Sequence, residues 1–151
     1  MGQQQLLLVI LVTIIIAIAT LVAVTTFRTA AVTANLDAVR QDMTLIGSAA
    51  QGYYVKPLMF GGGSRSFDGI SFNDMAFPAA GISVNGEEAQ NENGRYVITT
   101  AAGQELIITA HPVSDPAYVA GDIDIDGVLS GGTPASRTIV AIVFQDGFEF
   151  Q

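Results

Sequence analysis

The sequence predicts an α+β protein in which one long amino-terminal helix packs on a small antiparallel β-sheet. Three observations carry this prediction. The chain is apolar and without charge from Leu6 to Phe27. Apolar residues then recur every three or four positions as far as Tyr53. After Pro57 the composition changes to short β-branched runs separated by glycine and asparagine, which is typical of strands and turns.

The first segment, residues 1–27, is long enough to cross a membrane. Its uncharged run covers 22 residues, and as a helix it would be roughly 33 Å long, about the thickness of the hydrocarbon core of a bilayer. A helix of a soluble domain is rarely apolar on every face over this length. We therefore expect a protruding or transmembrane half-helix, enclosed by lipid or by copies of itself. A plain membrane anchor and a cleaved secretory signal stay open as alternatives, although no basic residue precedes Leu6.

The second segment, residues 28–56, has the pattern of an amphipathic helix that packs on the body of the protein. Its apolar residues follow each other in steps of four and three and so form one stripe: Val32, Leu36, Val39, Met43, Ile46, Ala50 and Tyr53. Polar residues fall on other faces, where we expect them to be hydrated: Asp37, Arg40, Gln41 and Asp42. No proline occurs before Pro57, so the sequence predicts one helix of about 50 residues.

The third segment, residues 57–151, is expected to form a loop and β-sheet domain of three to five strands. Four phenylalanines are candidate anchors of the loop: Phe60, Phe67, Phe72 and Phe77. A short strand leads into a turn at Asn85-Gly86, and strands near 95–100 and 105–110 form a hairpin. Residues 138–144 are apolar on both faces and predict a central strand covered on both sides, after which Asp146-Gly147 turns the chain. An all-β sandwich on an anchor is the alternative.

The amino-terminal part of the chain resembles the type IV pilin superfamily, the filament subunits and pseudopilins exported by prepilin-type machinery. The resemblance rests on the polar start GQQQ, the run LLLVILVTIIIAIATLVAV and the amphipathic continuation through Tyr53 and Tyr54. It implies a structural subunit that waits in the inner membrane and then polymerises through its apolar helix into a pilus on the cell surface. The residues implied in assembly lie at the start and in the core of the helix: Gln3, Gln4, Gln5, Leu6, Leu7, Ile15, Ala17 and Ala19.

One feature departs from the pilin pattern. The family usually carries glutamate as its fifth mature residue, where the carboxylate pairs with a neighbour's terminal amine. Here Gln5 or Leu7 takes that place, depending on where the mature chain begins. Because a glutamine accepts a hydrogen bond but supplies no opposite charge, we expect apolar packing to set the register of the subunits. We expect a polar cluster at the start of the helix, formed by Gln3, Gln4 and Gln5.

Two other functions fit the same residues. The chain could be a single-span membrane protein that displays a small binding domain, or a minor pseudopilin of a secretion apparatus. The continuity of the helix distinguishes the filament subunit from the plain anchor, because an anchor needs no apolar stripe from Val32 to Tyr53.

Charge and composition exclude several classes of function. Six basic residues against 14 acidic ones give a net charge of −8, which disfavours nucleic-acid binding by the body. Cysteine is absent, and His111 is the single histidine, so neither a thiolate site nor a histidine-based catalytic triad can be assembled. We expect no enzymatic activity.

One acidic motif resembles the beginning of a calcium-binding loop. Asp122, Asp124 and Asp126 alternate and are followed by Gly127, as in D-x-D-x-D-G. The match fails at the last position of the loop, where Thr133 replaces the bidentate glutamate. The competing interpretation is a half-buried strand with Ile123 and Ile125 pointing inward and three hydrated carboxylates. Calcium is the single cofactor that the sequence offers.

Overall fold

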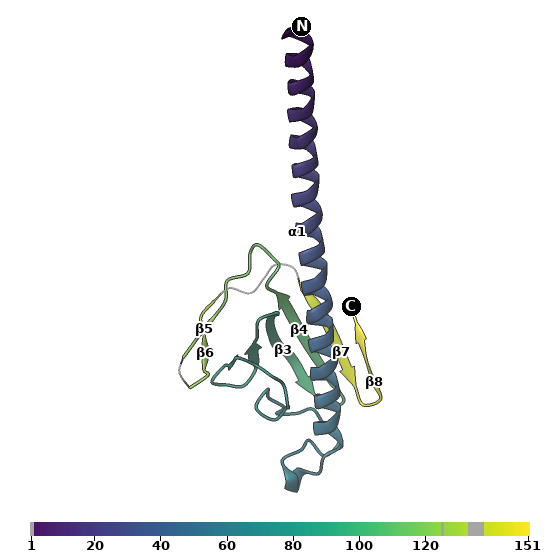
Figure 1. Ribbon diagram of the computed structural model, residues 1–151. Helices are drawn as coiled ribbons and strands as arrows, with labels where there is room; N and C mark the ends of the chain where they lie inside the picture. The colour runs from purple at the N-terminus through teal and green to yellow at the C-terminus, as the bar shows by residue number, and fades with distance from the viewer. Residues whose placement is uncertain (1, 125, 133–137) are drawn as a thin grey trace. The chain divides into compact units, whose positions relative to one another are not determined.

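The computed structural model describes residues 2–124, 126–132 and 138–151 and has the predicted α+β architecture (Figure 1). A long helix, α1 (Gly2–Val55), precedes a six-stranded antiparallel sheet. The chain divides into two compact units, residues 1–34 and residues 35–151. A helix packed on one sheet replaces the all-β sandwich, so that alternative is wrong.

The end of α1 follows from local sequence. Pro57 disfavours helical backbone at the residue before it, and the chain turns back on itself. The N–H of Gly63 donates to the carbonyl of Tyr53 at 2.9 Å. The N–H of Arg65 donates to the carbonyl of Tyr54 at 2.8 Å. The returning loop thus satisfies carbonyls that the last turn of a helix leaves without partners.

The stripe on residues 35–55 of α1 packs on the sheet largely as predicted. Five of its side chains are buried at helical spacing: Val39, Met43, Ile46, Ala50 and Tyr54. The first two positions of the predicted stripe, Val32 and Leu36, are half-buried. At the other end Tyr54 takes the buried place expected for Tyr53, which is half-buried. Burying each large apolar side chain contributes about 1.5–3 kcal/mol to stability.

The sheet has one more strand than the upper limit predicted. Its order is β1-β2-β3-β4-β7-β8, and β5 and β6 form a separate two-stranded pair. The strands are β1 (Gly81–Ile82), β2 (Glu88–Gln90), β3 (Gly94–Ala102), β4 (Glu105–Pro112), β5 (Asp122–Ile123), β6 (Leu129–Ser130), β7 (Ile139–Phe144) and β8 (Gly147–Phe150). A 3-10 helix, η1 (Leu58–Phe60), follows α1.

The predicted hairpin and turns are present. Strands β3 and β4 pair from Gly94 opposite Pro112 to Ala102 opposite Glu105. The expected turn at Asn85-Gly86 lies between β1 and β2, and Gly86 has a φ of 72°, which glycine adopts without strain. The turn at Asp146-Gly147 leads from β7 into β8.

The central strand β7 lies between β4 and β8, as predicted, but it is covered on one face only. Ala141 and Val143 are buried, whereas Val140 and Ile142, which alternate with them, are half-buried. Beneath the buried face, Gly47 of α1 leaves room for the side chains of Val143 and Phe148. Among the described residues α1 covers one face of β7, and the side chains on the other face stay half-exposed, so the expectation of cover on both faces is wrong.

The loop between α1 and β1 is anchored by aromatic side chains. Phe67, Phe72 and Phe77 are buried, as predicted, and the ring of Phe67 lies 4.9 Å from that of Tyr54. Phe60 is 65% exposed, so its assignment as an anchor is wrong. Phe60 belongs to η1, which precedes in sequence the part of the loop that Phe67, Phe72 and Phe77 anchor.

A polar network also ties α1 to the sheet. One oxygen of Asp42 accepts hydrogen bonds from the Asn91 amide at 2.9 Å, the Asn93 amide at 2.8 Å and the Tyr96 hydroxyl at 2.6 Å. The expectation that Asp42 is hydrated is therefore wrong, because the side chain points to the sheet. Burial, and then the hydrogen bond to Asp42, raise the pKa of Tyr96 well above its usual value near 10.

The raised pKa of Tyr96 predicts a loss of stability at alkaline pH. Above pH 10 the unfolded state releases the Tyr96 proton and the folded state retains it, so the free energy of unfolding falls as the pH rises. This one group is expected to remove about 1 kcal/mol between pH 10 and 11. Denaturant unfolding followed by circular dichroism measures the change. Tyr96→Phe should give a flatter pH profile, and an equally steep profile in that variant would contradict the assignment.

Further bonds mark the two ends of the helical stretch that packs on the sheet. At the first end the Asn35 amide donates to the carbonyl of Asn93 at 2.9 Å, and its oxygen accepts the N–H of Ser114 at 3.1 Å. At the other end the Tyr54 hydroxyl lies 3.3 Å from the side-chain oxygen of Gln145. The compact unit accordingly begins at residue 35, seven residues beyond the boundary between 27 and 28 expected from charge.

Candidate assembly surface

The first unit offers an apolar surface on every side of α1. The large apolar side chains from Leu6 to Phe27 are exposed, from 43% at Val12 to 75% at Phe27. Within α1, a stretch near the amino terminus is long and apolar enough to cross a membrane, and none of it is buried. Exposed apolar patches on soluble monomers are much smaller, so this surface requires an apolar environment.

The threonines of this unit do not interrupt its apolar character. All six hydroxyls donate to backbone carbonyls three or four residues earlier, at 2.8–3.1 Å: Thr13, Thr20, Thr25, Thr26, Thr29 and Thr33. A hydroxyl bonded within its own helix needs no partner from water. The unit can therefore enter lipid, or a bundle of helices, without leaving these donors unsatisfied.

The residues expected to take part in assembly all lie on this exposed surface. Gln3, Gln4 and Gln5 occupy the first turns of α1 and are exposed, as are Leu6 and Leu7. Ile15 is 56% exposed, and Ala17 and Ala19 are exposed nearby. Ile15 and Ala19 are four residues apart and share one face of the helix, where the small alanine permits close approach of another helix.

The three aspartates of the calcium motif lie in and after β5. Asp122 belongs to β5, and its side chain is exposed. The Asp124 carboxylate accepts the N–H groups of Asp126 and Val128 at 3.0 and 2.8 Å, which closes a tight turn. Within the part of the chain that the structure describes, no group of three or more acidic or histidine side chains is placed to hold a metal ion. Ile125 and Thr133 lie outside the described residues.

Three features of the body escaped the sequence analysis. The first is the acceptor role of Asp42. The second is a group of exposed apolar residues at the end of α1 and just after it, from Val55 to Phe60. The third is a pocket beside β1. The sequence could have indicated the role of Asp42, because this residue is three positions after Val39 and four before Ile46. It therefore lies at the edge of the buried stripe. The exposed apolar group depends on how the following loop folds back on the end of α1, and the pocket depends on how distant loops meet.

The chain matches no protein-family model, no curated protein and no solved structure. Its function must therefore be argued from its own surfaces.

Proposed function

We propose that this protein is a structural subunit of a type IV pilus-like extracellular filament and polymerises through residues 2–27 of α1. The observation that carries the proposal is the exposed apolar surface of this stretch, in a helix that continues into residues packed on the sheet. The subunit waits in the inner membrane, is exported by prepilin-type machinery, and exchanges lipid for the helices of neighbouring copies.

Helix packing supports this exchange energetically. Lipid tails and leucine side chains are equally apolar, so the gain on assembly comes from van der Waals packing and close approach of backbones. Ala17 and Ala19 provide that close approach, and the threonine hydroxyls are satisfied in either environment. No carboxylate needs to be buried, because the chain has no charged residue before Arg28.

The direct test is to shear surface material from cells that produce the full chain and to image it by cryo-electron microscopy. We expect helical filaments with a core of α1 helices and the sheet domains outside. Chains recovered entirely from the membrane fraction, with no filaments in the sheared material, would overturn the proposal. They would favour a single-span anchored binding domain, for which the membrane-spanning length of α1 is the supporting observation.

Filament cohesion should resist salt and yield to detergent. Apolar packing and a polar cluster of Gln3, Gln4 and Gln5 hold the core, and salt screens exposed charges rather than these contacts. We expect filaments to persist in about 1 M salt, where the Debye length is only about 3 Å. Detergents that compete for the apolar helix should disassemble them. Sedimentation after each treatment measures both effects, and the reverse pattern would contradict this account.

A further inference from the structure

A second apolar surface lies at the end of α1, outside the stretch already assigned to assembly. We call it the apolar tip: Val55, Leu58, Met59 and Phe60, each 65–85% exposed. The loop that carries it is closely packed. A Cβ on Gly62 would lie 2.3 Å from the Lys56 carbonyl oxygen, and one on Gly63 would lie 1.8 Å from that of Ser66. The packed loop and its bonds to the end of α1 thus hold the tip in its exposed position.

Basic residues flank the apolar tip. Lys56 precedes it and Arg65 follows it, and both are exposed. Elsewhere among the described residues, Arg40 and Arg95 are ion-paired with Asp37 and Glu88, and Arg28 belongs to the first unit. Among the residues that the structure describes, neither Lys56 nor Arg65 forms an ion pair. Asp146 lines the same hollow as Val55 and Arg65, so in a chain with a net charge of −8 Lys56 is the cation at the tip that is farther from a carboxylate in this hollow.

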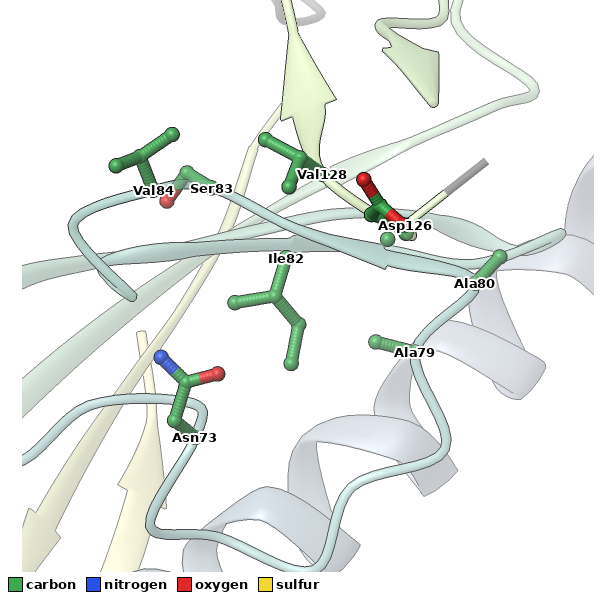
Figure 2. A pocket seen from close by; sticks show the side chains of 10 residues that line it. Asn73, Ala79, Ala80, Ile82, Ser83, Val84, Asp126 and Val128 are labelled. Atoms are coloured by element: carbon green, nitrogen blue, oxygen red, sulfur yellow. The ribbon is translucent and has the colours of Figure 1, made fainter. Parts of the chain in front are cut away.

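A pocket of about 440 Å³ opens beside β1, and we call it the β1 pocket (Figure 2). Small apolar and polar side chains line it together with one carboxylate: Asn73, Ala79, Ala80, Ile82, Ser83, Val84, Asp126 and Val128. Its volume is within the range of about 300–1,000 Å³ that encloses whole small ligands, so it can receive several side-chain groups. Figure 2 shows the Asp126 carboxylate beside Val128, with Ile82 on the other side of the strand.

The wall that carries Asp126 is held in place by hydrogen bonds between backbone groups and by two that the Asp124 carboxylate accepts. The N–H of Ile82 donates to the carbonyl of Gly127 at 2.9 Å, and Asp124 closes the turn from within. The exposed side chains of Asp122 and Asp124 lie in the same hairpin as Asp126. Asp126 is the one carboxylate among the residues that line the pocket, and the lining is polar and apolar in about equal parts.

We propose that the apolar tip of one copy docks in the β1 pocket of a second copy, with Lys56 and Arg65 facing Asp126. The proposal rests on the proposed filament function. Both surfaces belong to residues 35–151, and no tip residue lines the pocket of its own chain. Figure 1 shows the loop after α1 at the foot of this unit and the β5–β6 pair at its left side. Because tip and pocket are different surfaces, the contact is heterologous and can repeat from copy to copy without closing.

Charge complementarity selects a second copy as the occupant. Lys56 and Arg65 flank the tip and Asp126 lines the pocket, so two copies attract each other in this orientation. Four side chains bury too little area for a stable complex alone, since specific interfaces usually exceed about 1,000 Å². The contact becomes effective once the apolar helices hold copies together, because docking is then effectively intramolecular.

Disulfide cross-linking tests the contact, since the natural chain contains no cysteine. Full-length chains would carry one cysteine in the tip and one at the pocket, in three combinations: Leu58→Cys with Val128→Cys, Met59→Cys with Val84→Cys, and Phe60→Cys with Ala80→Cys. Filaments are checked by electron microscopy and then oxidised. We expect at least one combination to give a ladder of covalent oligomers on a non-reducing gel, whereas single cysteines stop at dimers. Met59→Cys with Val113→Cys is the matched control, because Val113 is exposed but does not line the pocket.

The outcomes separate this contact from the filament itself. Filaments without a ladder in any of the three combinations would overturn the docking contact and leave the filament function standing. A ladder from detergent-dispersed chains that form no filaments would support the contact and overturn the filament. Absence of both overturns both. A tip that cross-links to no copy but binds phospholipid vesicles would identify lipid as the occupant and refute the proposal.

Charge reversal gives a second measurement. Lys56→Glu should lower the yield of the ladder by about three- to five-fold, as expected for an exposed ion pair turned into repulsion. Combining it with Asp126→Lys should restore the yield, and Asp126→Lys alone should lower it. If Lys56→Glu has no effect in low salt, Lys56 does not face Asp126 and the proposed orientation is wrong.

Discussion

Ile15→Asp is expected to abolish filament assembly while the sheet domain stays folded. Ile15 lies in the middle of the uncharged run and is 56% exposed in the single chain, so assembly would bury it against neighbouring helices. An unpaired carboxylate buried there costs several kcal/mol or must take up a proton. Every subunit of the filament would bear this free-energy cost. The cost is larger than the stabilisation that packing around a single side chain provides. Filament yield in sheared material is the measurement.

Two controls distinguish failed assembly from failed folding or failed membrane storage. Ile15→Val removes one methylene and keeps the site apolar, so filaments should form. Thr13→Val removes a hydroxyl that is already bonded to the Ile10 carbonyl at 2.8 Å, so it too should be tolerated. An aspartate near the bilayer centre costs about 2.5–3.5 kcal/mol on insertion scales, so the membrane fraction of Ile15→Asp must be quantified as well. Normal filaments from a membrane-inserted Ile15→Asp chain would overturn the proposed assembly mechanism.

Asp42→Ala is expected to destabilise the sheet domain by about 1–3 kcal/mol. The substitution removes the acceptor of three hydrogen bonds and leaves the hydroxyl of the buried Tyr96 without its partner. The Asn91 and Asn93 amides lose the same oxygen. Denaturant unfolding of the full chain in mild detergent, followed by tyrosine fluorescence, gives the change, because the chain has four tyrosines and no tryptophan.

Asp37→Ala is the matched control for this variant. Asp37 lies on the same helix five residues earlier and makes an exposed ion pair with Arg40 at 3.0 Å. Exposed pairs of this kind contribute about 0–1 kcal/mol, so little change is expected. Asp42→Asn keeps an acceptor oxygen and should fall between the two. Equal stability of Asp42→Ala and Asp37→Ala would show that the network does not hold the helix on the sheet.

The sequence was sufficient to predict the helix and its buried face because both depend on local spacing. The steps from Val39 to Ala50 and the stop at Pro57 need no knowledge of the rest of the chain. The hairpin of β3 and β4 was also predictable, since each strand is long enough to show a pattern. Strand β1 has only two residues and was expected from the turn at Asn85-Gly86 that follows it, whereas β2 has three residues, which is too short for periodicity to identify.

The features that sequence analysis missed depend on contacts between distant residues. Asp42 is acidic and lies on a helix, which favours hydration, but residues about fifty positions away supply donors that keep it bonded. Phe60 and Phe67 both lie in glycine- and serine-rich sequence, so local composition does not distinguish them. Phe60 is exposed and Phe67 is buried, because the loop turns back at Gly63 to Arg65 between the two. The β1 pocket forms where two separate loops meet, so neither loop encodes it alone.

The bonds at the two ends of the packed helical stretch have a mechanical consequence. Asn35 and Asp42 anchor the stretch near its start, while Gln51 and Tyr54 bond to the end of β7 and the residue after it. A pull along α1 would load these attachments together in shear rather than peel them open one by one. Under tension the domain should therefore resist up to a high threshold and then yield in a single step, with the polar network around Asp42 setting much of that threshold.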